Sequence, residues 1–118
     1  VIDCGFSQET AYQEALKLII KNPEVTAFFC ASDIMAIGVL EAIESLGKKV
    51  PEDYSIIGFD DIPAARYICG GLTTIAQSPY TMGRKGGEVL LKMIEGRKYS
   101  SNIHIPYEFI NRNTVKNI

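Results

Sequence analysis

Apolar and polar positions along this chain follow two different periods in turn, which predicts alternating helices and strands. Segments with helical spacing of apolar side chains are expected at residues 8–21, 33–46 and 79–96. The possible N-caps are Ser7 for the first, Ser32 or Asp33 for the second and Ser78 for the third. Short apolar runs of the length of buried strands are found at 26–31, 55–59 and 72–77, and a further extended stretch at 103–115. Residues 62–68 read as a short helix or turn.

The order of these elements predicts the fold class. A strand followed by a helix and another strand at this spacing implies right-handed crossovers between parallel strands. We therefore expect an α/β protein with a doubly wound parallel sheet.

The segment 50–61, with the sequence V-P-E-D-Y-S-I-I-G-F-D-D, predicts a ligand-binding site at one edge of the sheet. A compact apolar strand ends there on two carboxylates, Asp60 and Asp61. In open α/β sheets, ligands bind outside the carboxyl ends of the strands. Because neighbouring strand residues point to opposite faces, Asp60 is the better ligand candidate and Asp61 the better structural one.

The predicted helix at 33–46 has an apolar surface wider than one sheet contact requires. Met35, Val39 and Leu46 lie in one stripe, and Leu40 and Ile43 lie in a second stripe beside it. Either another subunit covers the second stripe, or neighbouring helices of the same chain cover it.

Composition excludes several classes of protein. The chain has 118 residues, a net charge of -2 and a sequence pI near 5.4, and it contains no basic stripe of the kind that binds nucleic acid. No apolar run approaches the roughly 20 residues of a membrane span. No signal peptide is recognised within these residues, but the chain does not begin with Met, so a signal could have been removed or never included. Cys4, Cys30 and Cys69 are widely spaced, which favours free thiols in a reducing cytoplasm over a zinc site or a disulfide.

Five short motifs occur in an order and spacing that resemble the effector-binding core of the lac/gal-repressor family of bacterial transcription regulators. They are A-S-D-I-M-A-I-G (31–38), V-P-E-D-Y-S-I-I-G-F-D-D-I-P (50–63), A-R-Y (65–67), L-T-T-I-A-Q (72–77) and M-G (82–83). One departure from the family pattern is Gly70-Gly71, which stands in place of a proline-containing turn. This change is expected to loosen the connection before L-T-T.

The resemblance implies a fold like that of periplasmic sugar-binding proteins, in which two α/β lobes enclose a ligand cleft. Residues 1–77 and 107–118 would then belong to the C-terminal lobe, and 78–106 to a helix and strand of the N-terminal lobe. The family's helix-turn-helix would lie N-terminal to this chain, which implies a cytoplasmic location and contact with DNA only through that domain. The resemblance also implies a homodimer formed through residues 33–46 and 62–69.

Four ligand-binding residues are implied by the resemblance. Phe6 matches an aromatic position beside the ligand ring, although it could instead pack on the first helix. Ser32 matches a polar ligand position that could also cap the next helix. Asp60 could accept hydrogen bonds from neighbouring hydroxyls, and Gln77 is a weaker candidate that also fits a hinge between lobes.

Three functions are consistent with these observations. The favoured one is the ligand-sensing module of a transcription regulator, with a small sugar-like effector that modulates DNA binding. The alternative is a periplasmic sugar-binding protein of a transporter. An α/β enzyme that uses Asp60 and Asp61 is the third, but no catalytic triad, phosphate-binding loop or metal motif is present. We therefore expect no catalytic residue, no metal and no cofactor.

Overall fold

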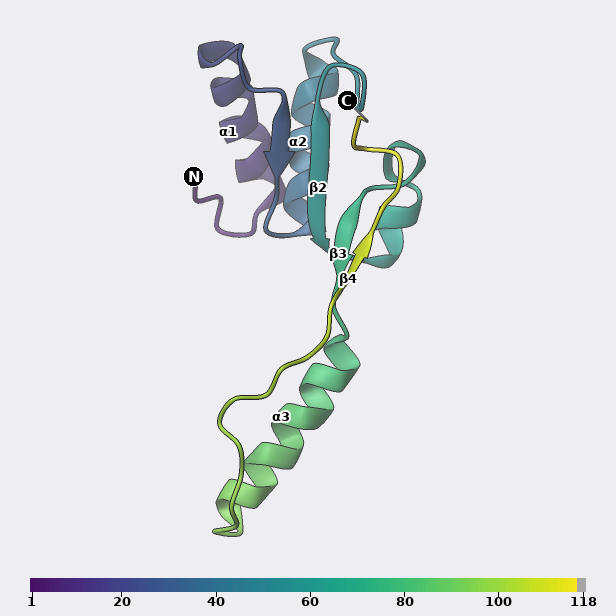
Figure 1. The fold of residues 1–118 in the computed structure, drawn as a ribbon. Helices are drawn as coiled ribbons and strands as arrows, with labels where there is room; N and C mark the ends of the chain where they lie inside the picture. Colours follow the sequence, from purple (N-terminus) through teal and green to yellow (C-terminus); the bar gives the residue numbers. More distant parts are fainter. Residues whose placement is uncertain (117–118) are drawn as a thin grey trace. The chain divides into compact units, whose positions relative to one another are not determined.

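A computed structural model describes residues 1–116 of the chain, which contain α-helices, strands and two short 3-10 helices (Figure 1). The elements follow in the order α1 (Gln8–Lys21), β1 (Ala27–Phe29), α2 (Asp33–Ser45), β2 (Ser55–Asp60), η1 (Pro63–Arg66), η2 (Ile68–Gly70), β3 (Thr74–Ala76), α3 (Pro79–Ile94) and β4 (Glu108–Ile110). The helices match the predicted ones closely. The strands β1, β3 and β4 are shorter than the apolar runs that predicted them, whereas β2 continues one residue beyond the predicted run 55–59.

The strands form a sheet in the order β1-β2-β3-β4. The strand pairs β1–β2 and β2–β3 are both parallel, with Phe29 opposite Ile57 and Asp60 opposite Ala76. Helix α2 supplies the crossover between the first two strands and lies behind them in the view of Figure 1. The predicted mixed α/β fold with a parallel sheet is confirmed.

The chain divides into two compact units, which we describe separately. The first consists of Val1–Ala76 with the returning segment from Phe109, and the second of Gln77–Glu108. The second unit contains α3, in which no residue is buried and in which the side chains of Leu90 and Leu91 are exposed. The assignment of residues 1–77 with 107–118, and of 78–106, to the two lobes of a binding protein stays a prediction.

The three helices begin as their sequences predict. At each start, a serine hydroxyl oxygen accepts a hydrogen bond from the backbone N–H three residues later, which satisfies a donor that the helix leaves unpaired. The pairs are Ser7 with Thr10 at 3.2 Å, Ser32 with Met35 at 3.2 Å and Ser78 with Thr81 at 3.3 Å. These caps are local, so sequence alone was sufficient to place two of them and to narrow the cap of α2 to Ser32 or Asp33, of which the structure shows Ser32.

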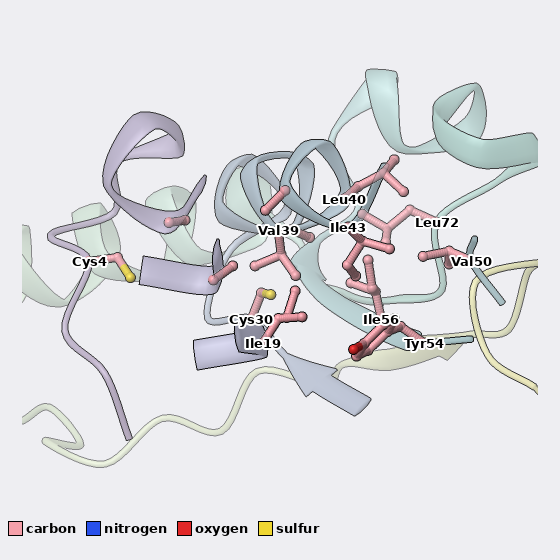
Figure 2. Packing of buried hydrophobic residues seen from close by; sticks show 14 of the residues in the cluster. Cys4, Ile19, Cys30, Val39, Leu40, Ile43, Val50, Tyr54, Ile56 and Leu72 are labelled. Carbon is pink, nitrogen blue, oxygen red and sulfur yellow. The ribbon is translucent and has the colours of Figure 1, made fainter. Parts of the chain in front are cut away.

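The second apolar stripe of α2 is covered by the chain itself. Leu40 is 8% exposed and Ile43 is fully buried, and both lie in one cluster with Ile56 and Leu72 (Figure 2). The reading in which neighbouring elements cover this stripe is therefore correct. The reading in which Leu40 and Ile43 contact another subunit is wrong, because these side chains already fill the core of the first unit.

Helices α1 and α2 approach each other closely at Gly38. A Cβ atom at this position would lie 2.2 Å from the carbonyl oxygen of Gln8 and 3.0 Å from the backbone nitrogen of Tyr12. Only glycine leaves room for this contact between two helix backbones. Gly38 therefore sets the distance between the two helices.

The Gly70-Gly71 turn is held in place rather than loosened. Asn113 donates from its side-chain amide to the carbonyl oxygen of Gly70 at 2.6 Å and from its backbone N–H to that of Gly71 at 2.9 Å. Both glycines have positive φ, 72° and 123°, which glycine adopts without the steric cost of a Cβ atom. The expectation of a loose connection is wrong because the returning C-terminal segment supplies these hydrogen bonds.

The cysteines are free thiols, as predicted, and Cys4 and Cys30 are buried. Within residues 1–116, the structure contains no helix with the length and apolar character needed to span a membrane.

Candidate functional site

The carboxyl ends of β1, β2 and β3 form one edge of the sheet, because these strands are parallel. The β1–α2 junction with Ser32 lies at this edge, and so does the end of β2 at Asp60. Figure 1 shows the turn before α1 at the same end of the first unit. The first unit thus brings Phe6, Ser32 and Asp60 to one end of its sheet.

Asp60 and Asp61 have different roles in the structure. Asp60 is the last residue of β2 and is exposed, with φ at 113°. Asp61 has φ at 51° and forms an ion pair of 2.5 Å with Arg112, in which both side chains are more than four-fifths buried. Asp61 is therefore a structural carboxylate, and Asp60 presents its carboxylate at the sheet edge.

Phe6 lies in the turn before α1, with φ at 56° and 71% of the residue exposed. A phenyl ring packed on the first helix would be largely covered, so the exposed fraction argues against that alternative. An exposed aromatic face is suited to the apolar C–H face of a sugar ring. Contact with a ligand stays a prediction.

Ser32 caps α2 and is 5% exposed. Its hydroxyl oxygen accepts the Met35 N–H, which uses one lone pair of the oxygen. The capping role is therefore established. A ligand hydrogen bond from the same hydroxyl stays a prediction.

Gln77 follows β3 and falls in the second unit, where it is partly buried. Gln77 is therefore not one of the predicted ligand residues that the first unit brings together, and its ligand role stays a prediction.

A buried carboxylate that the sequence did not reveal lies beneath the sheet edge. Asp33, the first residue of α2, has no exposed surface. One of its oxygens accepts the hydroxyl of Thr74 at 2.6 Å, and the other accepts the backbone N–H of Ile62 at 2.9 Å. The N-terminus of α2 adds a favourable dipole for the negative charge. The only sequence signal for Asp33 was its position after an N-cap serine, and an exposed carboxylate in the first turn of a helix has the same position.

Arg112 is a second residue of the edge that sequence reasoning missed. Its guanidinium donates to the Asp61 carboxylate and, at 2.8 Å, to the carbonyl oxygen of Leu72, while its backbone N–H donates to the Thr73 hydroxyl at 3.0 Å. A planar guanidinium with several fixed donors suits this double contact. Arg112 thereby connects the returning segment to the residue directly after β2 and to the two residues directly before β3.

Thr114 extends the same connection deeper into the first unit. Its hydroxyl donates to the carbonyl oxygen of Ile56 at 2.7 Å and accepts the backbone N–H of Thr73 at 2.9 Å. Thr114 and Thr73 are fully buried. The returning segment is therefore part of the scaffold beneath the sheet edge.

A cavity of about 300 Å³ lies in the first unit. It is bordered by α1, β1 and the first residues of the chain, and its lining includes Ala11, Phe28 and Val39 but none of the four predicted ligand residues. The lining is mostly apolar, with Glu14 as its charged side chain, whereas a sugar site needs several convergent polar groups beside its apolar surface. We therefore place the candidate site at the carboxyl edge of the sheet.

Cys30 lies just beneath this edge and does not act as a nucleophile there. Burial, with smaller contributions from nearby Cys4 and Asp33, raises the pKa of the Cys30 thiol to about 12. The thiol therefore stays protonated at neutral pH, and a protonated thiol is a poor nucleophile. Within residues 1–116, no group of three or more His, Cys, Asp or Glu side chains is placed to hold a metal ion.

Comparison with known proteins places this arrangement among related domains. Residues 3–115 match the family described as periplasmic binding protein-like domain. The chain is 41% identical over 122 aligned positions to the HTH-type transcriptional repressor PurR of Haemophilus influenzae (strain PittEE), covering all of this chain and 36% of that protein. The chain thus spans about a third of the length of the curated relatives it matches.

Solved structures give the same result at the level of the fold. A LacI family transcriptional regulator from Enterococcus faecium with bound ribose superposes with a TM-score of 0.81 and 35% identity, covering 93% of this chain and 41% of that one. The lac repressor dimer bound to operator and the anti-inducer ONPF superposes with a TM-score of 0.83 and 29% identity, covering 92% and 38%.

Proposed function

Because this chain belongs to the periplasmic binding protein-like family, as part of the effector-binding region of a lac/gal-repressor-type regulator, we propose that it binds a small sugar-like effector that modulates DNA binding. In this proposal the effector contacts Phe6, Ser32, Asp60 and Gln77. DNA contact belongs to a helix-turn-helix domain outside this chain. The complete protein acts in the cytoplasm.

The observation that carries the proposal is the grouping of an exposed aromatic ring and an exposed carboxylate at one end of a parallel sheet. Phe6 and Asp60 both occupy positions with positive φ, where a non-glycine residue is uncommon. Such conformations occur most often at functional sites, where the surrounding structure maintains them. An aromatic face and a carboxylate together match the apolar face and the hydroxyls of a sugar.

The comparisons support the sugar-like class of effector and the regulatory role. The regulator from Enterococcus faecium was solved with ribose, and a similar regulator from Arthrobacter was solved with lactose. The curated relatives at 34–41% identity are named as repressors. A periplasmic sugar-binding protein of a transporter shares the fold, but these similarities favour the regulator over that alternative.

We predict that Asp60→Asn in the complete regulator weakens effector binding by about 2 kcal/mol, or roughly 30-fold, because the amide loses the charge that strengthens hydrogen bonds to the effector. The folded state should be little affected, since Asp60 is exposed. A thermal-shift screen of pentoses, hexoses and disaccharides on the unmodified regulator would identify a binding sugar, and calorimetry would give the affinities.

The matched control for this experiment is Glu24→Gln, which neutralises an exposed carboxylate in the loop after α1. The control should bind the identified sugar as tightly as the unmodified regulator does. Equal affinities for the Asp60 variant and the control would remove Asp60 from the site.

We also propose that the regulator is a homodimer through residues 33–46 and 62–69. Since Leu40 and Ile43 are buried within the chain, the contact would use exposed positions such as Ile34 of α2, which is 41% exposed, and Tyr67 between η1 and η2, which is 84% exposed. Exposed tyrosines are frequent energetic centres of protein interfaces. The lac repressor structure with which this chain superposes is a dimer on its operator.

This proposal predicts that Tyr67→Glu weakens dimerisation of the 118-residue chain at least tenfold, because a buried unpaired charge at an interface is costly. Sedimentation or light scattering across a concentration series would measure the change. Tyr99→Glu serves as control, since Tyr99 is also exposed but lies in the loop after α3. A chain that is monomeric at high concentration, or equal effects of both variants, would contradict the proposed contact.

A further inference from the structure

The backbone after β2 has a conformation that L-amino acids seldom adopt. Asp60 has φ at 113°, outside the left-handed helical region, and Asp61 has φ at 51°, inside it. Two such residues in succession persist only where the surrounding structure determines their conformation. Asp60 is also the residue whose carboxylate the proposed function places on the effector. The contacts that hold this segment therefore decide where that carboxylate points.

The buried carboxylate of Asp33 holds the downstream end of this segment. It accepts the backbone N–H of Ile62, the residue directly after Asp61, at 2.9 Å. Its second oxygen accepts the hydroxyl of Thr74 in β3 at 2.6 Å, so the carboxylate is itself fixed in orientation. Hydrogen bonds to a charged acceptor are shorter and stronger than those between neutral groups. One side chain thus connects the start of α2, the exit from β2 and the neighbouring strand.

The packing of β2 shows that the chain leaves space for this carboxylate. A Cβ atom at Gly58 would lie 2.2 Å from the Oδ1 atom of Asp33 and 2.9 Å from the Cδ2 atom of Leu72. The carboxylate therefore lies directly against the strand that carries Asp60, two residues before it. Asp61, between Asp60 and Ile62, is held separately by Arg112.

We propose that Asp33 is a positioning residue of the effector site. Its carboxylate, held by Thr74, fixes the backbone from Asp60 to Ile62 and so sets the direction in which Asp60 presents its own carboxylate. This inference rests on the proposed function, in which the Asp60 carboxylate contacts the effector. Asp33 itself is fully buried and does not contact the effector.

The test uses nuclear magnetic resonance on the 118-residue chain without any effector. In Asp33→Asn, which keeps the side-chain shape and removes the charge, the Ile62 amide should exchange with solvent at least tenfold faster. The Cα and Cβ chemical shifts of Asp60 and Asp61, which report backbone conformation, should move as well. Ile43→Val is the control for lost stability, because it removes one buried methyl group from α2 away from the carboxylate.

A second pair of variants keeps the test decisive if Asp33→Asn does not fold. Thr74→Val removes the hydroxyl that orients the carboxylate while preserving the side-chain shape, and Thr74→Ser retains the hydroxyl. The valine variant should shift the Asp60 and Asp61 resonances and speed exchange of the Ile62 amide. The serine variant should keep the resonances and the exchange rate close to those of the unmodified chain. Changes at residues 60–62 that are no larger than those in Ile43→Val, or equal effects of valine and serine, would overturn the inference.

The test of Asp33 and the test of the proposed function can fail independently of each other. If Asp60→Asn leaves sugar binding unchanged, the effector role of Asp60 fails, whereas the resonances still report whether Asp33 controls the segment. If the resonances do not move but Asp60→Asn weakens binding, the positioning role of Asp33 fails and the effector site stands.

Discussion

Replacing Gly38 with alanine is expected to lower the free energy of unfolding of the first unit by about 2–3 kcal/mol, the upper part of the range for overpacked cores. The new methyl group would lie 2.2 Å from the carbonyl oxygen of Gln8 and 3.0 Å from the Tyr12 backbone nitrogen. Neither atom can move without its helix, so α1 and α2 must separate. That cost exceeds the roughly 1 kcal/mol by which alanine is favoured over glycine inside a helix.

Urea denaturation followed by circular dichroism would measure this change. Gly86→Ala is the matched control, because Gly86 lies inside α3 and a Cβ atom there has no neighbour within 4 Å. The control should keep or slightly raise stability, by up to about 1 kcal/mol. Unchanged stability in Gly38→Ala would show that the two helices are not in close contact.

Removing the guanidinium of Arg112 is expected to cost about 3 kcal/mol of stability, the lower end of the range for breaking a buried ion pair. Arg112→Ala leaves the Asp61 carboxylate without its cation and the Leu72 carbonyl oxygen without its donor. Asp61 is 18% exposed at the side chain, so water can only partly replace these contacts.

Thermal and urea denaturation would establish the size of this effect. The control is Arg97→Ala, because the pair between Arg97 and Glu95 has side-chain exposures of 65% and 51%. Pairs of that kind contribute between zero and about 1 kcal/mol. Arg112→Lys should fall between the unmodified chain and the alanine variant, since one ammonium replaces only part of the guanidinium fork. Similar losses in Arg112→Ala and Arg97→Ala would contradict the structural role of the Asp61–Arg112 pair.

The candidate site shows which side chains could be predicted from sequence. Asp60 was predicted because it ends an apolar run, and the end of a parallel strand is a recurrent ligand position. Asp33 was not predicted as a buried group, because its partners Ile62 and Thr74 are 29 and 41 residues away in the chain. A carboxylate in the first turn of a helix is usually exposed and stabilised by the helix dipole alone. Its burial depends on the strands that the fold brings against it.

The same distinction explains why the sequence left two readings of α2 open. The apolar pattern correctly predicted that Leu40 and Ile43 avoid water. It did not specify whether the covering surface belongs to the same chain or to another. Periodicity records only that a side chain is buried, whereas the identity of its neighbours depends on how α1 and the sheet pack around α2.

The sequence by itself determined the helix starts at Ser7 and Ser78, the start of α2 at Ser32 or Asp33, and the α/β order of the chain, because caps and hydrophobic periods act over a few residues. Tertiary structure alone decided the buried carboxylate of Asp33 and the Asp61–Arg112 pair, whose members are 51 residues apart. Such contacts form only when packing of the whole unit brings distant segments together and excludes water from their polar groups. For that reason, no local pattern in the sequence reports them.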